Sequence, residues 1–260
     1  MEDEKYRRLL DRLRGMKRAA IAFSGGADST FLLAVAREAL GDSVLALTVV
    51  TPYMDRQEIA DTLTLAGELG VRHELVELDM PAGMEANPPE RCYVCKHALF
   101  SKLLERAGEA GFPRVLDGSN LDDLSDYRPG MRALGELEIE SPLLECKLTK
   151  ADVRRLSEAL HLSTWDKPTN ACLLTRLPIG TRVVMEDLQR VEEAERLLKA
   201  RGYRWVRVRL CQDLARIEVD PPQRARLLEE SEEVSAELES LGFRYVTLDL
   251  RGYRLGSMNP

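Results

Sequence analysis

The sequence predicts an α/β protein, with a doubly wound, mostly parallel sheet followed by a smaller C-terminal α+β domain. Over the first two thirds of the chain, short apolar runs typical of buried strands alternate with segments of helical periodicity. An irregular segment at residues 165–181 contains two prolines and a glycine, and the pattern changes after it. We therefore expect two domains, at residues 1–178 and 179–260.

Four apolar runs supply the expected parallel strands: AAIAF, SVLALTVV, HELVEL and PRVLDG, in chain order. The charged segment 1–18 is typical of an amphipathic helix, and further helices are expected at residues 30–40, 55–69 and 93–107. Gly41 and Gly70 stand where helices commonly end. Right-handed crossovers through these helices make the sheet doubly wound.

The remaining elements complete the first domain and build the second. Residues 148–162 predict a helix with Thr149 as N-cap and Asp152 as its third-position partner. The second domain is expected to contain helices at residues 185–201 and 221–241, a two-strand hairpin at 203–210 and 214–219, and a last strand at 244–250. This order is typical of a small α+β domain.

Composition excludes several classes of function. The chain has 260 residues, a formal charge of -7 and a pI near 5.3, which is unfavourable for holding nucleic acid by broad phosphate neutralisation. No stretch has the apolar length of a signal peptide or a membrane span. We expect a cytoplasmic protein without a nucleic-acid or membrane partner. Its five cysteines are then better interpreted as thiols, metal ligands or catalysts than as disulfides.

The segment SGGADS at residues 24–29 joins the first strand to a helix. Adjacent glycines allow a ligand to approach the backbone, and the amides at a helix N-terminus attract an anion. The loop therefore predicts a phosphate site, although it is neither GxxxxGK[ST] nor GxGxxG. The alternative is a tight strand-to-helix turn with a serine cap.

Three cysteines have a spacing that suggests chemistry. Cys92 and Cys95 form CxxC, and Cys172 lies in NACLLTR at the expected domain boundary. Three thiolates can hold a [4Fe-4S] cluster and leave one iron open for an exogenous sulfide. Zinc is an alternative that needs a fourth ligand, with His97 and Cys146 as candidates, and plain thiols are another. Otherwise Cys146 and Cys211 are expected to be ordinary buried residues.

The hairpin of the second domain carries arginines on one face. Strand alternation places Arg207 and Arg209 on the same side, and Arg216 and Glu218 share a side of the next strand. Guanidinium groups bind phosphate and carboxylate in bidentate fashion, so this face is a candidate substrate site. A solvated sheet face is the alternative.

A second charged loop follows the fourth expected strand, where ligands of open parallel sheets collect. It is a candidate ATP or substrate wall, with a solvated loop as the alternative. The three histidines suggest no general base, and no Ser-His-Asp arrangement is evident. The candidate residues of the loop are Asn120, Asp122, Asp123, Asp126 and Arg128.

The loop at residues 24–29 resembles the SGGxDS signature of the PP-loop ATP pyrophosphatases, which split ATP between its α and β phosphates and adenylate a substrate oxygen. The resemblance implies that Asp28 positions magnesium. It also implies an ATP site made of Ser24, Gly25, Gly26, Asp28 and Ser29, to which Asn120 of the second loop is added.

An ordered set of segments narrows the resemblance to the LarE sulfur transferases and covers nearly the whole chain. The segments include AFSGGADST, NPPERCYVCKHALF, DGSNLDDLSDYRPGMRA, SPLLECKLTKADVR, DKPTNACLLTRLPIGT, RVRLCQDLARIEV and DLRGYRLGSMN. The resemblance implies that ATP adenylates a carboxylate of a pyridinium biscarboxylic acid mononucleotide and that sulfur displaces AMP. The thiocarboxylate product serves the nickel-pincer cofactor of lactate racemase.

The resemblance also implies roles for single residues. In one branch of the family a cysteine matching Cys172 gives up its own sulfur and becomes dehydroalanine. In the other branch three cysteines hold an iron-sulfur cluster, and the presence of Cys92, Cys95 and Cys172 favours this branch here. Arg207 and Arg209 match substrate-phosphate arginines, and Glu195 matches a family residue near the sulfur site and is a candidate metal ligand. Sulfide or another sulfur donor and a homo-oligomer are implied as well.

Three other functions remain open at this point. A tRNA thiolase shares the loop and in some cases three cysteines, but the acidic balance counts against it. An amidating enzyme such as NAD synthetase would not need the cysteines. A regulatory module that only binds ATP is the non-enzymatic alternative.

Overall fold

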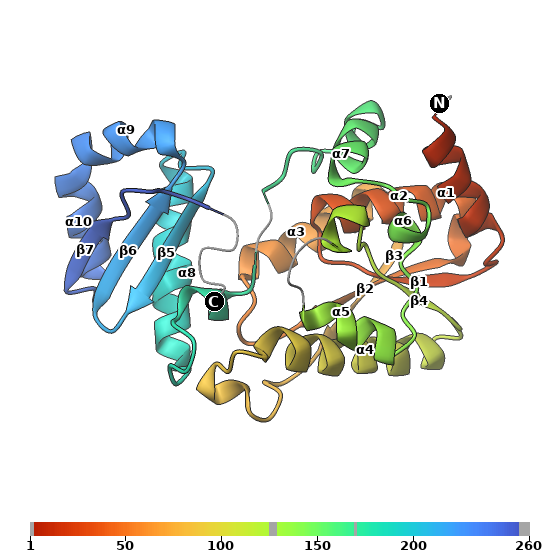
Figure 1. The fold of residues 1–260 in the computed structure, drawn as a ribbon, viewed down its shortest axis with the longest axis horizontal. Helices are drawn as coiled ribbons and strands as arrows, with labels where there is room; N and C mark the ends of the chain where they lie inside the picture. The colour runs from red at the N-terminus through yellow and green to blue at the C-terminus, as the bar shows by residue number, and fades with distance from the viewer. Residues whose placement is uncertain (1–2, 125–128, 169–170, 255–260) are drawn as a thin grey trace. The chain divides into compact units, whose positions relative to one another are not determined.

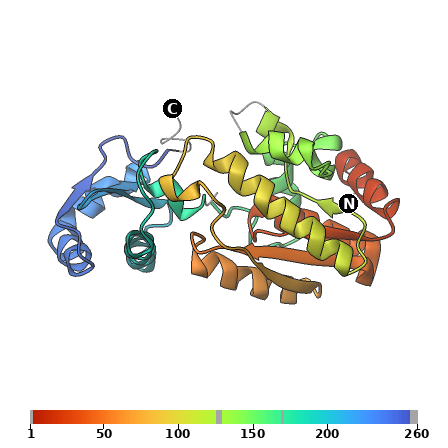
Figure 2. The same ribbon diagram turned by 90° about the horizontal axis from the view of Figure 1, so that it is seen from below.

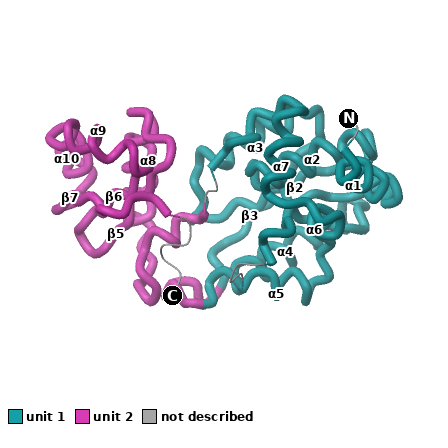
Figure 3. The backbone as a smooth tube through the Cα atoms, turned by 45° about the horizontal axis from the view of Figure 1, so that its top comes forward, with its two compact units in different colours: residues 1–81, 90–170 teal, residues 82–89, 171–260 magenta. Residues whose placement is uncertain are grey.

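The computed structural model describes residues 3–124, 129–168 and 171–254. The chain forms two compact units, one of residues 1–81 and 90–170 and the other of residues 82–89 and 171–260 (Figure 3). The short segment 82–89 thus belongs with the C-terminal unit. The expected domain boundary between residues 178 and 179 stays a prediction.

The first unit is built on a parallel sheet of four strands in the order β3-β2-β1-β4. Every neighbouring pair is parallel, which confirms the predicted α/β class. The order reverses between β1 and β4, because the chain first winds to one edge and then returns to the other side of β1. The strands are β1 (Ala19–Ala22), β2 (Val44–Val50), β3 (Arg72–Glu77) and β4 (Val115–Leu116).

Helices cover both faces of this sheet (Figure 1). In Figure 2 the orange helix α3 and the yellow helix α4 lie on opposite sides of the strands. The helices of the unit are α1 (Glu4–Arg14), α2 (Ala27–Leu40), α3 (Arg56–Glu68), α4 (Arg91–Glu109), α5 (Pro129–Glu136), α6 (Pro142–Glu145) and α7 (Lys150–Ala159), with short 3-10 turns at Gly41–Ser43 and Leu121–Leu124.

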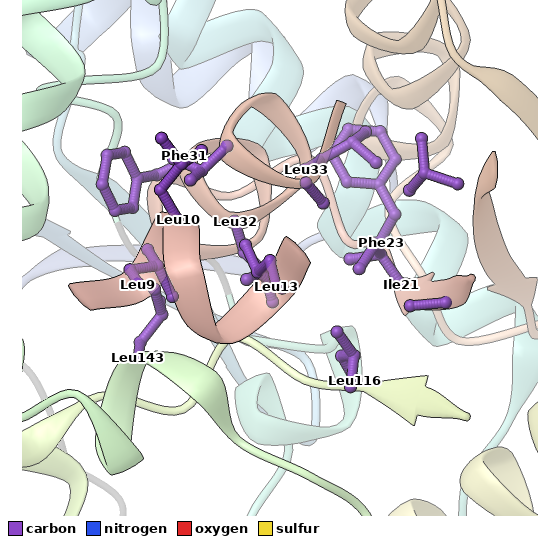
Figure 4. Packing of buried hydrophobic residues seen from close by; sticks show 14 of the residues in the cluster. Leu9, Leu10, Leu13, Ile21, Phe23, Phe31, Leu32, Leu33, Leu116 and Leu143 are labelled. Carbon is purple, nitrogen blue, oxygen red and sulfur yellow. The ribbon is translucent and has the colours of Figure 1, made fainter. Parts of the chain in front are cut away.

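Strand alternation divides the buried residues between two apolar clusters. Ala19 and Ile21 of β1 face α1 and α2, whereas Ala20 faces the cluster that contains residues of α4. Figure 4 shows Leu9, Leu13 and Phe31 packed together on the first side. Both faces of β1 and β2 are therefore covered by apolar side chains. This leaves the ends of these strands as the place where polar side chains can gather.

The second unit packs helices against a three-stranded sheet of order β5-β6-β7. β5 and β6 form the predicted antiparallel hairpin, and β7 runs parallel to β6. The 3-10 turns Met84–Ala86 and Leu173–Arg176 precede the main helix of the unit. Its elements are α8 (Met185–Ala200), β5 (Val206–Cys211), β6 (Leu214–Val219), the 3-10 turn Pro221–Gln223, α9 (Arg224–Glu229), α10 (Ser231–Ser240) and β7 (Tyr245–Leu248).

Several predicted helix boundaries differ from the structure by a few residues. α2 begins at Ala27, not at residue 30, because Gly26 is its N-cap, so Asp28 and Ser29 belong to the first helical turn. The single helix expected at 221–241 is wrong, since Glu230 ends α9 and precedes α10. Across the described ranges, no helix has the length and apolar character that a membrane crossing requires.

Candidate active site

The loop after β1 is shaped by its glycines and by two serines. Gly25 has φ of 68°, and a Cβ there would lie 3.1 Å from Cγ2 of Thr62 on α3. The Ser29 hydroxyl donates to the Gly26 carbonyl at 3.2 Å and accepts from the Ser24 amide at 3.3 Å. The loop thus folds back on the first turn of α2, where the leading amides of a helix have no partner within it. Such amides suit a phosphate.

The second charged loop meets the first at the point where the strand order reverses. Asn120, which follows β4, donates through Nδ2 to the Asp28 carboxylate at 3.3 Å. A Cβ on Gly118 would lie 3.1 Å from the Ser29 amide nitrogen, so a side chain there would require the backbone to shift by a few tenths of an ångström. Ligands of open parallel sheets bind at this position. The predicted ATP residues are therefore brought together.

Asn120, Asp122 and Asp123 hold the second loop in place. The Asn120 amide donates to the Asp123 carboxylate at 2.9 Å, and the Asp122 carboxylate accepts from the Lys150 amide at 2.8 Å. These two aspartates accept hydrogen bonds from backbone amides, and the role of the loop as an ATP or substrate wall stays a prediction. Asp126 and Arg128 lie outside the described residues.

Asp28 already holds a cation. Its carboxylate forms an ion pair with the ammonium group of Lys150 at the start of α7. The Asp28 side chain is 25% exposed to solvent, so an ion can reach it. A carboxylate beside a phosphate loop is a hard oxygen donor of the kind that magnesium prefers. The residues present therefore fit the predicted magnesium, which would take the place of Lys150 on Asp28.

Lys167 connects the phosphate loop to α3. Its ammonium group donates to the Gly25 carbonyl at 3.3 Å and pairs with Glu58 at 2.9 Å and Asp61 at 3.0 Å. Burial lowers the pKa of Lys167, but the two carboxylates outweigh burial, and the net pKa is raised. The lysine is charged at neutral pH and fixes the backbone of Gly25.

Cys92 and Cys95 lie at the start of α4, in the first unit. Cys92 is exposed and Cys95 is partly buried, and both are free thiols. Burial raises the pKa of Cys95, and its 3.3 Å hydrogen bond with the Tyr53 hydroxyl only partly offsets this effect. Two soft donors close together on one helix fit a metal or cluster site. Cys146 is buried, as expected for a packing residue, whereas Cys211 is only partly buried.

Cys172 belongs to the second unit, where it precedes the 3-10 turn Leu173–Arg176. Its carbonyl accepts hydrogen bonds from the Thr175 amide at 3.0 Å and the Thr175 hydroxyl at 2.8 Å. Cys172 is in no disulfide, and its side chain is partly exposed. The predicted three-cysteine set therefore draws on both units, and its joint role stays a prediction.

The arginines of the hairpin are buried, so the solvated-face alternative is wrong. Arg207 is 6% exposed and Arg209 is 5% exposed. Arg209 forms a bidentate pair with Glu218, with distances of 3.0 and 2.9 Å, and also donates to the Thr175 carbonyl at 2.8 Å. Burial, followed by the nearby charge of Arg176, lowers the pKa of Arg207.

Glu195 lies in the same buried cluster, paired with Arg176. The two side chains meet at 2.8 and 2.9 Å, and the Val208 amide donates to Glu195 at 3.0 Å. Burial raises the pKa of Glu195, but Arg176 more than offsets it, and the net pKa is lowered. A metal on Glu195 would have to displace Arg176, and the metal role stays a prediction. In the part of the chain that the structure describes, no three His, Cys, Asp or Glu side chains gather as a metal site.

Sequence reasoning missed Lys150, Lys167 and Arg176. Lys150 is the first residue of α7, where the helix dipole disfavours a cation. A lysine at this unfavourable position could have indicated a role outside the helix. Arg176 stands in the apolar run LLTRL, which was a second signal. Lys167 had no signal, because only the fold brings it to Gly25.

A glycine loop at the reversal point of a parallel sheet, with an aspartate ready for a metal ion, defines an ATP-using enzyme of the PP-loop class. Residues 9–88 match the NAD synthase family. Pyridinium-3,5-bisthiocarboxylic acid mononucleotide synthase of Lactiplantibacillus plantarum is 37% identical over 96% of this chain and 92% of its own length. The chain belongs to the family of this synthase, the LarE sulfur transferases.

Two further relatives mark the extent of this similarity. An uncharacterized protein of Synechocystis is 42% identical over 100% of this chain and 98% of its own length. A glutamine-dependent NAD(+) synthetase of Synechocystis is 37% identical over 25% of this chain and 12% of its own length. The likeness to amidating enzymes is therefore local.

Proposed function

We propose that this protein uses ATP to adenylate a carboxylate of pyridinium biscarboxylic acid mononucleotide and then replaces an oxygen of that carboxylate by sulfur. The carboxylate oxygen attacks the α-phosphorus of ATP and pyrophosphate leaves. A sulfur nucleophile next attacks the acyl carbon, and AMP leaves with the oxygen. The thiocarboxylate is a precursor of the nickel-pincer cofactor of lactate racemase.

One observation carries this proposal: a buried cluster in the second unit holds three arginines against two glutamates. The members are Arg176, Arg207, Arg209, Glu195 and Glu218, all at most 6% exposed. Guanidinium groups bind phosphate and carboxylate in bidentate fashion, so a group of buried arginines is suited to an anionic ligand. A mononucleotide with a phosphate and two carboxylates has the required charge.

Residues of the first unit act on ATP in this proposal. The amides of residues 24–29 and the N-terminus of α2 bind pyrophosphate, and Asp28 holds magnesium after Lys150 releases it. Lys167 donates to the Gly25 carbonyl and so fixes the backbone of the loop. No proton transfer by a histidine is needed, because the leaving group is stabilised by magnesium and fixed amides.

Cys92, Cys95 and Cys172 are the proposed ligands of a [4Fe-4S] cluster. When bound, the cluster supplies an iron that can carry sulfide. The thiols must lose their protons to bind iron, and the raised pKa of Cys95 means that binding releases a proton from it at neutral pH. The rival proposal is that Cys172 donates its own sulfur.

Pyrophosphate release separates this function from the alternatives. We expect release with ATP and the pyridinium mononucleotide, and none with bulk tRNA, with nicotinate adenine dinucleotide plus ammonia, or without an acceptor. Release that depends on tRNA or on ammonia would overturn the proposal. Release without any acceptor would indicate hydrolysis of ATP to AMP and pyrophosphate and would contradict an acceptor-dependent reaction.

Assembly, sulfur donor and location belong to the same proposal and rest on the family resemblance. We infer a homo-oligomer that works in the cytoplasm with sulfide or another small sulfur donor. Sedimentation analysis checks the assembly, and a single monomeric species at the working concentration would contradict it.

A further inference from the structure

Arg176 is the largest of the fully buried side chains, and every nitrogen of its guanidinium group has a partner. Nε and Nη2 bind the two oxygens of Glu195. Nη1 turns the other way and donates to the Ala171 carbonyl at 2.6 Å and the Cys172 carbonyl at 3.2 Å. The arginine thus joins α8 to the backbone that carries Cys172.

Neighbouring contacts extend this connection to the arginine hairpin. The Val208 amide of β5 donates to Glu195, and Arg209 of β5 donates to the Thr175 carbonyl. Nη1 of Arg176 also binds the Thr175 hydroxyl at 3.0 Å. The turn that follows Cys172 is therefore tied at several points to the strand that carries Arg207 and Arg209.

Stability alone does not account for this pair. Two buried charges are expensive to desolvate, and apolar residues of similar volume are often as stable. The fork of a guanidinium group, however, fixes direction as well as charge, because its donors lie in one plane. In Arg176, Nε and Nη2 donate to Glu195, and Nη1 on the opposite side of the guanidinium group donates to the Cys172 carbonyl.

We propose that Arg176, anchored by Glu195, is the positioning residue for Cys172, and that it sets the place of the thiol relative to the substrate arginines. This inference rests on the proposed part of Cys172 in sulfur transfer. It gives Glu195 a role as anchor of Arg176. An error of about 1 Å in the position of a reacting group can cost ~10²-fold in rate, so such an anchor has a measurable effect.

The test replaces both members of the pair, so that neither is left buried without its partner. The double variant Arg176→Met/Glu195→Leu removes the carbonyl contacts but keeps apolar packing, and Arg176→Lys keeps the charge but loses the fork. The control Arg12→Met/Glu145→Leu removes an arginine–glutamate pair from the first unit, with a distance of 2.8 Å in the wild type. Thermal unfolding of each variant checks that it is folded.

Two measurements are made on each folded variant. In a single turnover we expect sulfur transferred per pyrophosphate released to fall ~10²-fold in the double variant and to fall also in Arg176→Lys, with no fall in the control. Without any ligand, peptide mass mapping compares alkylation of Cys172 with that of Cys211. We expect this ratio to change in both Arg176 variants and to stay constant in the control.

The outcomes separate this inference from the proposed function. A folded Arg176 variant with the wild-type sulfur yield and the wild-type alkylation ratio overturns the inference. An equal loss of pyrophosphate release and sulfur transfer would indicate general damage and also contradicts positioning. If wild-type protein releases no pyrophosphate with the mononucleotide, the proposed function fails, and the alkylation ratio still tests the position of Cys172.

Discussion

At the scale of single residues, the site is a set of charges that hold one another in place. Lys150 pairs with Asp28, and Lys167 pairs with Glu58 and Asp61. In the second unit, arginines pair with Glu195 and Glu218. The sequence predicted Asp28, Arg207 and Arg209 from their motifs, but their partners come from distant segments and carry no local pattern.

Asp28→Asn tests the magnesium site. The amide is similar in size but has no charge, so it holds neither Lys150 nor magnesium. We expect mononucleotide-dependent pyrophosphate release to fall by ~10²-fold or more, as on losing a group that stabilises transition-state charge. Asp42→Asn, which removes an exposed carboxylate paired with Arg37, is the matched control. Wild-type turnover in a folded Asp28→Asn protein would reject the assignment.

Arg207 is the better arginine for testing substrate affinity. Removing Arg209 would leave Glu218 buried with a lost partner, which destabilises the fold in addition to any effect on binding. We expect Arg207→Gln to weaken mononucleotide binding by about 1.5–3 kcal/mol, the value of a hydrogen bond to a charged group. ATP affinity should stay constant, as measured by calorimetry with each ligand.

The control for this measurement is Arg204→Gln, because Arg204 is an exposed arginine just before the same strand. It should leave both affinities near the wild-type values. Equal losses for ATP and the mononucleotide in Arg207→Gln would point to misfolding and would remove the argument for a phosphate site.

At the scale of helices and strands, local sequence patterns predicted most elements. They failed to predict boundaries that depend on contacts between distant segments. The capping box of Thr149 and Asp152 was predicted and is present. β4 is only two residues long, because the apolar run PRVLDG soon turns into the loop that meets Asp28. The break at Glu230 was missed, and the Tyr203 hydroxyl that donates to the Glu230 carboxylate at 3.0 Å comes from a distant segment.

Thr149→Ala tests whether the start of α7 matters for ATP. The Thr149 hydroxyl accepts from the Asp152 amide at 3.1 Å, and loss of such a cap costs ~1 kcal/mol of stability. Because Lys150 follows directly and pairs with Asp28, we also expect weaker ATP binding. Denaturant unfolding and calorimetry measure the two effects. Thr149→Ser keeps the cap and should restore both; a loss of stability with unchanged ATP affinity would disconnect α7 from the site.

At the scale of the whole chain, two compact units each supply a different kind of group. The first unit has the anion loop, Asp28, Cys92 and Cys95, and the second has Cys172 and the buried arginines. Short apolar runs that alternate with helical segments were enough to predict the parallel sheet. Strands that are buried on both faces appear in the sequence as continuous apolar runs. Arg176 and Glu195 could not be paired from the sequence, since 3-10 and helical segments bring them together only in the fold.

The source of the sulfur decides how the two units share the chemistry. If Cys92, Cys95 and Cys172 hold one cluster, protein reconstituted without oxygen should bind about four irons, and each single change to alanine should reduce iron binding and repeated sulfide-dependent turnover. Cys211→Ala, which alters a cysteine outside this set, should keep both. In the sacrificial mechanism each chain gives one sulfur, and Cys172 loses the mass of hydrogen sulfide as it becomes dehydroalanine. Stoichiometric loss of that mass, together with a fully active Cys92→Ala protein, would exclude the cluster and assign sulfur transfer to Cys172 alone.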